Sequence, residues 1–235
     1  MRHRQFTFVF IKNCLYFRDI SNNRKGIFVR STSQEWKNNL LLMLGKLEYI
    51  KNIPKNNPTG THLHVGCGKN VIDGFKNIDK YFYHPDILAY DMFELPFNNQ
   101  TVDTIYSSHS LEHLPIRQAK LAISKWYNIL KRGGMLYLAI PDLEEIMLIM
   151  TDPNVSEDAK EFWYLYTLFG YQADCSDLNN AYDLNAPTDY GQFHKCGFTK
   201  SMITKTLVVH GFNIEQIYNY DGYATPSIWV EARKY

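Results

Sequence analysis

The chain has few cysteines, no long apolar run and no excess of one charge. Its 235 residues include four scattered cysteines, Cys14, Cys67, Cys175 and Cys196, with no C-x-x-C pair. This spacing gives no disulfide framework, so we expect a reducing, cytoplasmic location. The 25 basic and 24 acidic side chains nearly balance at a net charge of +1, and no long Lys/Arg run occurs. We therefore expect no nucleic-acid partner.

The N-terminal stretch does not have the pattern of a targeting segment. Residues 1–17, MRHRQFTFVFIKNCLYF, start basic and apolar, but Lys12 and Asn13 interrupt the apolar run early. No small-x-small cleavage site follows, and no stretch reaches the length of a membrane span. We interpret this segment as a strand or a docking arm.

Hydrophobic patterns divide the chain into an N-terminal part, residues 1–60, and a main domain, residues 61–235. Apolar side chains recur at helical spacing over 35–50, which predicts a lid helix before a Pro/Gly-bearing linker. Short strand-like runs then follow at 61–66, 75–80, 86–92, 102–108 and 135–142. The fourth run leads into a helix that ends near Leu130, and KRGG (131–134) predicts a turn. Strands that alternate with helices or turns indicate a parallel, doubly wound sheet.

The C-terminal part has a different pattern. Two strands at about 212–220 and 226–233, with a turn near Asp221-Gly222, predict a closing β-hairpin. Between 143 and 200 lies an aromatic-rich insertion, which we expect to be a helical lid over the substrate. The predicted fold is therefore α/β: a Rossmann-like, doubly wound, mainly parallel seven-stranded sheet with a C-terminal β-hairpin and a helical lid insertion.

A short glycine motif and two acids mark a ligand site on this sheet. Gly66-Cys67-Gly68 directly follows the first strand of the main domain, where glycines let backbone approach a ligand closely. Asp79 ends the next strand and Asp91 the third. In open α/β sheets, ligands bind at these carboxyl ends, and an acid there can accept bonds from ribose hydroxyls. The third glycine of the dinucleotide motif is missing, and no G-K-[ST] is present to bind phosphate.

Four segments together resemble the class I S-adenosylmethionine-dependent methyltransferases, in particular the type 11 group. They are LHVGCG (63–68), DGFKNID (73–79), YDMFELPFNNQTVDTIYSSHSLEHL (90–114) and ILKRGGMLYLAIPD (129–142). The resemblance implies S-adenosylmethionine as cofactor. It places the methionine part at the glycine motif, the ribose at the second strand, the adenine at the third, and the sulfonium near the fourth. The cofactor-binding residues so implied are Gly66, Cys67, Gly68, Asp79, Lys80, Asp91, Met92, Ser107 and Ser108.

The sequence departs from the family pattern at two places. The acid that often ends the first family strand appears here as His64, which affects the usual contact to the cofactor's amino group. No [ND]-P-P-[YFW] motif follows the fourth strand, which argues against methylation of amino groups on DNA bases or glutamine.

Residues His109-Ser110-Leu111-Glu112-His113 form H-x-x-E-H, the pattern of inverted zinc peptidases. A peptidase needs this motif on a long helix, whereas here it adjoins a strand of a nucleotide-binding sheet. The motif resembles the E-x-x-E-H of small-RNA 2′-O-methyltransferases and ubiquinone-pathway O-methyltransferases, which bind a divalent metal there. That resemblance implies Mg or Zn at His109, Glu112 and His113, with His194 as a distant further ligand. A histidine acting directly as base, or a purely structural role, remains an alternative.

The predicted activity is methyl transfer to an oxygen of a sugar or another small hydroxylated metabolite. The insertion carries aromatic and acidic side chains, which suit a carbohydrate ring better than a polyanion. N-methylation of a small amine, a nicotinamide-dependent oxidoreductase and a non-catalytic cofactor-binding subunit are the alternatives. The oligomeric state stays open.

Overall fold

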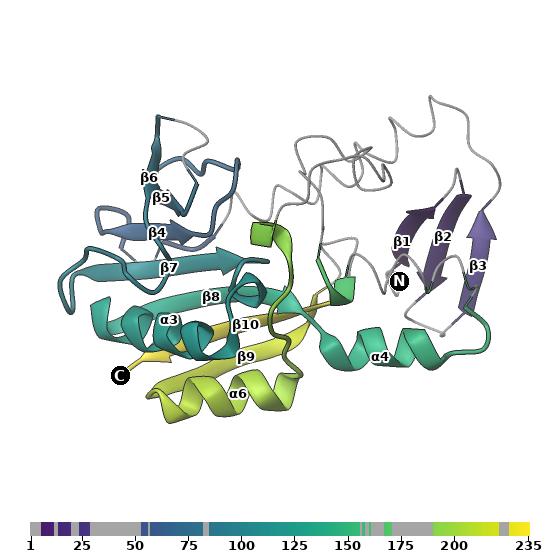
Figure 1. Ribbon diagram of the computed structural model, residues 1–235. Helices are drawn as coiled ribbons and strands as arrows, with labels where there is room; N and C mark the ends of the chain where they lie inside the picture. The colour runs from purple at the N-terminus through teal and green to yellow at the C-terminus, as the bar shows by residue number, and fades with distance from the viewer. Residues whose placement is uncertain are drawn as a thin grey trace.

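The computed structural model describes residues 6–11, 14–19, 24–28, 53–55, 57–81, 85–155, 157, 160, 167–170, 190–220 and 226–235 (Figure 1). The main domain is built on a seven-stranded sheet with the order β6-β5-β4-β7-β8-β10-β9. Its strands are β4 (His62–Val65), β5 (Lys76–Asp79), β6 (Ile87–Ala89), β7 (Val102–Ser108), β8 (Leu130–Pro141), β9 (Phe212–Tyr220) and β10 (Ser227–Lys234).

The first five strands of this sheet are parallel, and the last two form an antiparallel hairpin against β8. The strand order reverses at β4, because β5 and β6 follow on one side of it while β7 and β8 lie on the other. Ligands of open α/β sheets bind at such a switch point. The predicted Rossmann-like, mainly parallel seven-stranded sheet with its C-terminal hairpin is confirmed.

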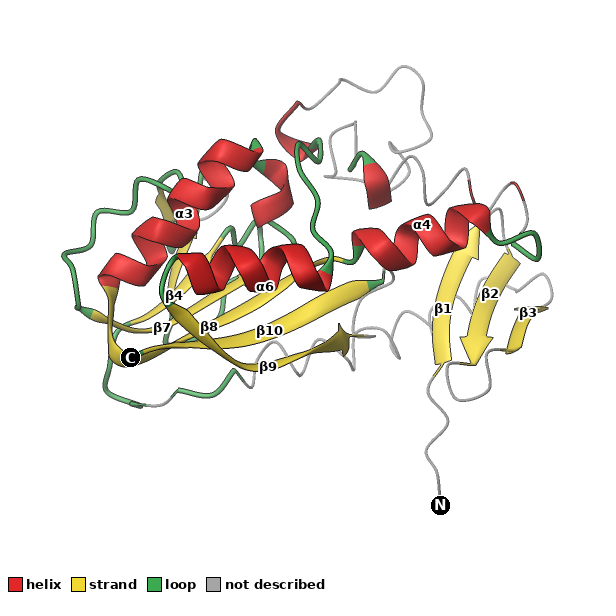
Figure 2. Cartoon of the chain, turned by 90° about the horizontal axis from the view of Figure 1, so that it is seen from below, coloured by secondary structure: helices red, strands yellow, loops and turns green. Residues whose placement is uncertain are grey.

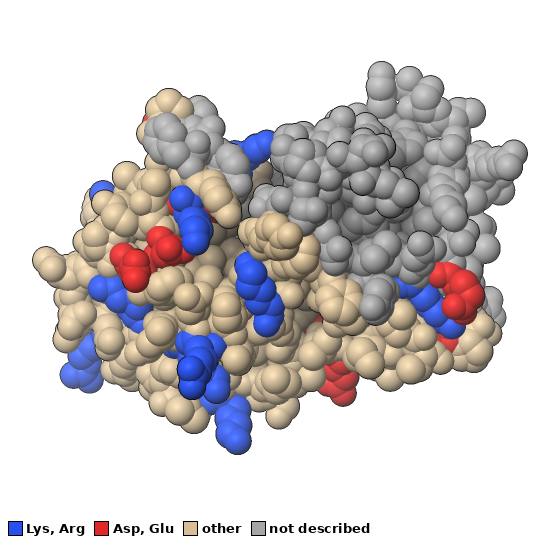
Figure 3. Space-filling model, viewed as in Figure 1, with Lys and Arg blue, Asp and Glu red and all other residues tan. Residues whose placement is uncertain are grey.

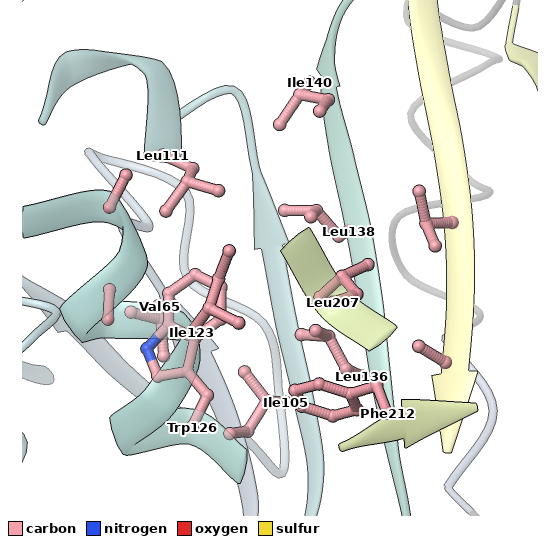
Figure 4. Close-up of a cluster of buried hydrophobic side chains, with 14 of the residues drawn as sticks. Val65, Ile105, Leu111, Ile123, Trp126, Leu136, Leu138, Ile140, Leu207 and Phe212 are labelled. Carbon is pink, nitrogen blue, oxygen red and sulfur yellow. The ribbon is translucent and has the colours of Figure 1, made fainter. Parts of the chain in front are cut away.

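The centre of the sheet is buried on both faces, which explains its near-continuous apolar runs. All four residues of β4 are buried, and so are six of the seven in β7. Figure 4 shows Ile123 and Trp126 of α3 (Ile116–Ile129) directed at Val65 and Ile105 of the sheet. Burial of these apolar side chains holds α3 against the sheet.

Two further helices complete this part of the chain. Helix α6 (Lys200–Val209) lies beside α3 along the sheet, and α4 (Leu143–Thr151) continues from the end of β8 (Figure 2). Each begins with a side-chain cap: Asp142 accepts bonds from the amides of Glu144 and Glu145, and Thr199 accepts one from Met202. Short 3₁₀ turns, η1 (Leu111–His113) and η4 (Tyr190–Gln192), lie at the site edge.

The predicted turn at 131–134 is wrong, because β8 starts at Leu130 and includes this segment. The pairing with β7 moves from Val102↔Leu130 to Thr104↔Met135. Gly133-Gly134 therefore lies inside β8 next to a shift in register, and Gly133 has a φ of +79°.

The N-terminal segment forms its own three-stranded antiparallel sheet from β1 (Phe6–Ile11), β2 (Cys14–Asp19) and β3 (Arg24–Phe28). This agrees with the strand alternative for residues 1–17. The predicted helix at 35–50, the turn near Asp221-Gly222 and most of the aromatic part of the insertion lie outside the described residues. The division at residue 60 stays a prediction. None of the helices that the structure describes is long and apolar enough to cross a membrane.

Candidate active site at the carboxyl edge of the sheet

The glycine motif forms a tight turn directly after β4. The amides of Gly66 and Cys67 both donate to the carbonyl of Ile78, at 2.8 and 3.0 Å, which binds the turn to β5. Gly66 and Gly68 have φ values of +70° and +54°, a conformation that favours glycine. A Cβ on Gly66 would lie 2.3 Å from the Cβ of Ser110, whereas a Cβ on Gly68 would meet none of the described atoms within 4 Å. The backbone at Gly68 thus faces open space that a ligand could fill.

Asp79 ends β5 beside this turn. One carboxylate oxygen accepts the amide of Gly68 at 2.8 Å, and the other accepts the amide of Tyr81 at 3.0 Å. These bonds fix the carboxylate next to the glycine turn, while each oxygen keeps a second lone pair for another donor. The arrangement fits the predicted contact to ribose hydroxyls.

The predicted adenine side lies after β6. Lys80 and Asp91 form an ion pair at 3.5 Å, with 62% and 27% of their side chains exposed. The backbone of Met92 is fixed in place, because its carbonyl accepts the indole N–H of Trp126 at 2.9 Å. Its Cε lies 3.6 Å from the Cβ position on Gly66, so Met92 lines the glycine turn.

The serines at the end of β7 and directly after it divide into a buried and a more exposed group. Ser107 and Ser110 are buried, and their hydroxyl oxygens are 2.7 Å apart. Ser110 also donates to the carbonyl of Val65 at 3.4 Å and thereby connects β7 to β4. Ser108 is partly exposed and is the better placed of the two predicted serines for a ligand. Ser110 was not predicted, since only its packing against Gly66 shows its importance.

The H-x-x-E-H motif does not lie on one α-helix. The amide of His109 still pairs with the carbonyl of Ala139 at 2.9 Å, so β7 continues its ladder to this point. His109 then takes a φ of +47°, and only Leu111–His113 form a 3₁₀ turn. The shared helical face that a zinc peptidase motif requires is therefore absent from this described segment.

His109 lies between two polar partners. Its Nε2 is 3.0 Å from the hydroxyl of Ser227, which lies 118 residues further along the chain at the start of β10. Its Nδ1 is 3.5 Å from Oε1 of Glu112, and 22% of the His109 side chain is exposed. Because a carboxylate only accepts, we assign the proton to Nδ1, which leaves Nε2 as an acceptor toward a hydroxyl. Ser227 could not be found from sequence, because only strand pairing brings it here.

His194 lies beside Glu112 and His113, although 81 residues separate it from His113. The amides of Lys195 and Cys196 donate to the carbonyl of Glu112 at 2.8 and 3.2 Å and hold this segment in place. The rings of His113 and His194 meet edge to face with centroids 4.9 Å apart. One ligand atom from each of Glu112, His113 and His194 lies within 4.8 Å of the others. His109, predicted as a member of the metal cluster, contacts Glu112 from outside this group.

Burial and mutual charge perturb the titration of this cluster. Burial alone raises the pKa of Glu112, but His109, His113 and His194 outweigh it in their charged forms and lower this pKa to about 2. Burial lowers the pKa of His194, and the Glu112 carboxylate offsets this only in part. Burial and the same carboxylate raise the pKa of Cys196 to about 12, so its thiol keeps its proton. Such opposed shifts are typical of functional sites.

Comparisons with known proteins agree with the fold. Residues 74–138 match a family model described as a methyltransferase domain. An S-adenosylmethionine-dependent methyltransferase from Methanosarcina mazei is 15% identical, with a TM-score of 0.53 over 80% of this chain and 96% of that one. A Thermotoga maritima protein, described as an S-adenosylmethionine-dependent methyltransferase and possible histamine N-methyltransferase, is 14% identical. Its TM-score is 0.51 over 86% of this chain and 96% of that one. No curated protein matches.

The sheet order, the glycine turn and the acid after β5 define a Rossmann-like methyltransferase fold. The family match shows that residues 74–138 belong to a methyltransferase domain, and the fold around them is that of S-adenosylmethionine-dependent methyltransferases. The predicted family and enzyme class are confirmed. The roles of the individual site residues remain predictions.

Proposed function

We propose that this methyltransferase acts on a hydroxyl group of a small, ring-shaped acceptor such as a sugar, with His109 as the general base. S-adenosylmethionine supplies a methyl carbon that is already activated toward displacement. The chain must then position the acceptor, exclude water and take up the hydroxyl proton.

The observation that carries this proposal is the environment of His109. Glu112 orients the Nδ1 side of the ring, and Nε2 faces a hydroxyl, that of Ser227, at 3.0 Å. An imidazole held in this way accepts a proton at Nε2, while the carboxylate stabilises the resulting charge. His109 directly follows Ser107 and Ser108, where we expect the reacting end of the cofactor. An acceptor hydroxyl could take the place of Ser227 or pass its proton through it.

A ring-shaped acceptor is supported by an aromatic pair near the cluster. Tyr190 is 73% exposed, and its ring centroid lies 5.4 Å from that of Phe193, the residue before His194. An exposed aromatic face can stack on a sugar ring while nearby polar groups orient its hydroxyls. Charged side chains on the face shown in Figure 3 are dispersed and include both signs, with no single broad basic patch over the described atoms. This supports a small acceptor over a polyanion.

The divalent metal expected at the histidine cluster belongs to the same proposal. Glu112, His113 and His194 would hold such an ion, and a cation there would lower the pKa of an acceptor hydroxyl.

The test compares panels of monosaccharides and other small polyols with panels of small amines, and measures S-adenosylhomocysteine release and product mass. We expect turnover in the hydroxyl panel. His109→Gln should lower kcat by about 10²–10⁴-fold, while S-adenosylhomocysteine affinity stays within about threefold. Turnover with amines alone, or unchanged kcat in His109→Gln, would contradict the proposal. Calorimetry with NAD and S-adenosylhomocysteine separates the oxidoreductase alternative.

A further inference from the structure

Helices α3 and α6 carry charge of one sign only. Neither contains an acidic side chain, and together they hold five basic ones: Arg117, Lys120, Lys125, Lys200 and Lys205. The whole chain, by contrast, is nearly balanced at a net charge of +1. Arg117, Lys120 and Lys205 are exposed and form no ion pair with another described residue. Their positive charge is therefore directed at solvent or at a partner.

The same two helices expose large aliphatic side chains. Leu121 of α3 is 58% exposed, and Val208 and Val209 of α6 are 54% and 74% exposed. Each has a basic neighbour one helical turn away. Arg117 precedes Leu121 by four positions, and Lys205 precedes the two valines by three and four. Single exposed apolar side chains are normal, but a group of them interleaved with Lys and Arg is typical of surfaces that bind a membrane interface.

The two helices form one continuous face of the molecule. They lie side by side along the sheet (Figure 2), and Ile123, Trp126 and Leu207 on their inner sides are buried in the core. Side chains on the opposite sides of both helices therefore point away from the sheet. We call this surface the helical face; its exposed residues are Ile116, Arg117, Lys120, Leu121, Met202, Lys205, Val208 and Val209. Figure 3 shows basic side chains over this part of the molecule that neutral surface separates from one another.

Dispersed cations among aliphatic side chains fit an anionic lipid surface better than other partners. A nucleic acid is bound mainly through its phosphates, and it would leave the aliphatic side chains exposed to water. A second copy of this chain would place two basic faces against each other in a two-fold contact, and like charges oppose such a contact. At a bilayer, Lys and Arg reach the lipid phosphates while the aliphatic side chains between them enter the headgroup boundary.

We propose that the helical face docks this protein peripherally on an anionic lipid surface. The face begins beside the candidate active site, since Ile116 follows His113 by three residues and Lys200 follows His194 by six. Docking would therefore bring this edge of the sheet close to the lipid headgroups. The docking surface rests on the composition of α3 and α6, so it does not depend on the proposed acceptor.

The experiment measures sedimentation of the full chain with lipid vesicles. One set contains phosphatidylcholine alone, and the other contains about one third phosphatidylserine. We expect binding to the anionic vesicles only, and at least about tenfold weaker binding as NaCl rises from about 0.05 to 0.5 M. Arg117→Gln and Lys205→Gln should each weaken binding about fivefold. Lys76→Gln is the matched control, since Lys76 is exposed at the start of β5 and its loss removes the same charge elsewhere.

The aliphatic part of the helical face is tested at constant net charge. The double variant Leu121→Ser/Val209→Ser should bind the anionic vesicles about tenfold more weakly than the parent chain. Calorimetry with S-adenosylhomocysteine shows that each variant is folded, and the salt dependence of the parent chain needs no variant.

Four outcomes would overturn the proposal. They are no binding to anionic vesicles, equal binding to both vesicle types, equal losses in Lys76→Gln and Lys205→Gln, and unchanged binding in the double serine variant. Analytical ultracentrifugation tests the other occupant of this face. A parent dimer that the double serine variant dissociates would show that a second copy covers the helical face instead of lipid.

Discussion

Gly66→Ala and Gly68→Ala make a matched pair that tests the geometry of the cofactor turn. Both glycines have positive φ, so either substitution costs about 1–2 kcal/mol of folding free energy from the backbone alone. At Gly66 the new methyl would also lie 2.3 Å from the Cβ and 2.4 Å from the Oγ of Ser110. Ser110 cannot move freely, because its hydroxyl bonds to Ser107 and Val65. Overpacking of this kind costs about 1–3 kcal/mol more.

We therefore expect Gly66→Ala to lose about 2–5 kcal/mol of stability and Gly68→Ala about 1–2 kcal/mol. Urea denaturation measures both values, and thermal unfolding should show a shift of about 2–4 °C per kcal/mol. Cofactor affinity should follow a different order. The methyl on Gly68 enters the open space in front of the turn, so calorimetry should show at least a tenfold weaker S-adenosylhomocysteine complex for this milder variant. Equal stability losses, or an unchanged S-adenosylhomocysteine affinity in Gly68→Ala, would refute this account of the turn.

Two further predictions concern buried polar groups. Burial lowers the pKa of His64 from 6.5 to about 4, so the unfolded chain binds its proton more readily and stability is lost as pH falls from about 6.5 to 4. The loss of unfolding free energy amounts to about 3 kcal/mol, at about 1.4 kcal/mol per pKa unit. His64→Gln should therefore flatten the pH dependence of the unfolding free energy measured in urea. An equally steep pH dependence in His64→Gln would contradict this. Lys234 donates to the carbonyls of Tyr127, Asn128 and Leu130, which close the end of α3. Lys234→Met should lower the free energy of unfolding by about 1–3 kcal/mol, whereas exposed Lys205→Met should stay within about 0.5 kcal/mol; similar losses in both would argue against a capping role.

Most of the fold could be predicted from the sequence, because most strands have a recognisable local pattern of apolar residues between turns. Short apolar runs between turns predicted β4, β5, β6, β7 and the terminal hairpin at nearly their observed positions. Strands buried on both faces need continuous apolar residues, so these runs are unambiguous when helices alternate with them. The start of β8 was missed because Gly133-Gly134 has turn chemistry, while pairing with β7 incorporated it into the strand. A ladder between distant strands can thus override a local preference.

Only part of the candidate site could be predicted from such local patterns. The glycine turn and Asp79 follow strands directly, so their place at the carboxyl edge of a parallel sheet was predictable from the strand pattern. His109, Glu112 and His113 were also marked by the sequence, but their mutual geometry was not. The helical spacing of the motif was misleading, because strand pairing extends through His109 and delays the first helical turn to Leu111.

Sequence alone therefore predicted the fold, through the order of its strands, and the resemblance of four segments to a known family predicted the enzyme class. Only the tertiary structure decided which polar groups share the pocket. Backbone bonds from residues 195 and 196 to Glu112 bring His194 beside His113, and the pairing of β10 with β8 brings Ser227 to His109. Contacts across such long sequence separations depend on how the strands and loops close around one core. No local pattern of residues encodes them, and they decide whether Glu112 serves as an isolated acid or as part of a metal centre.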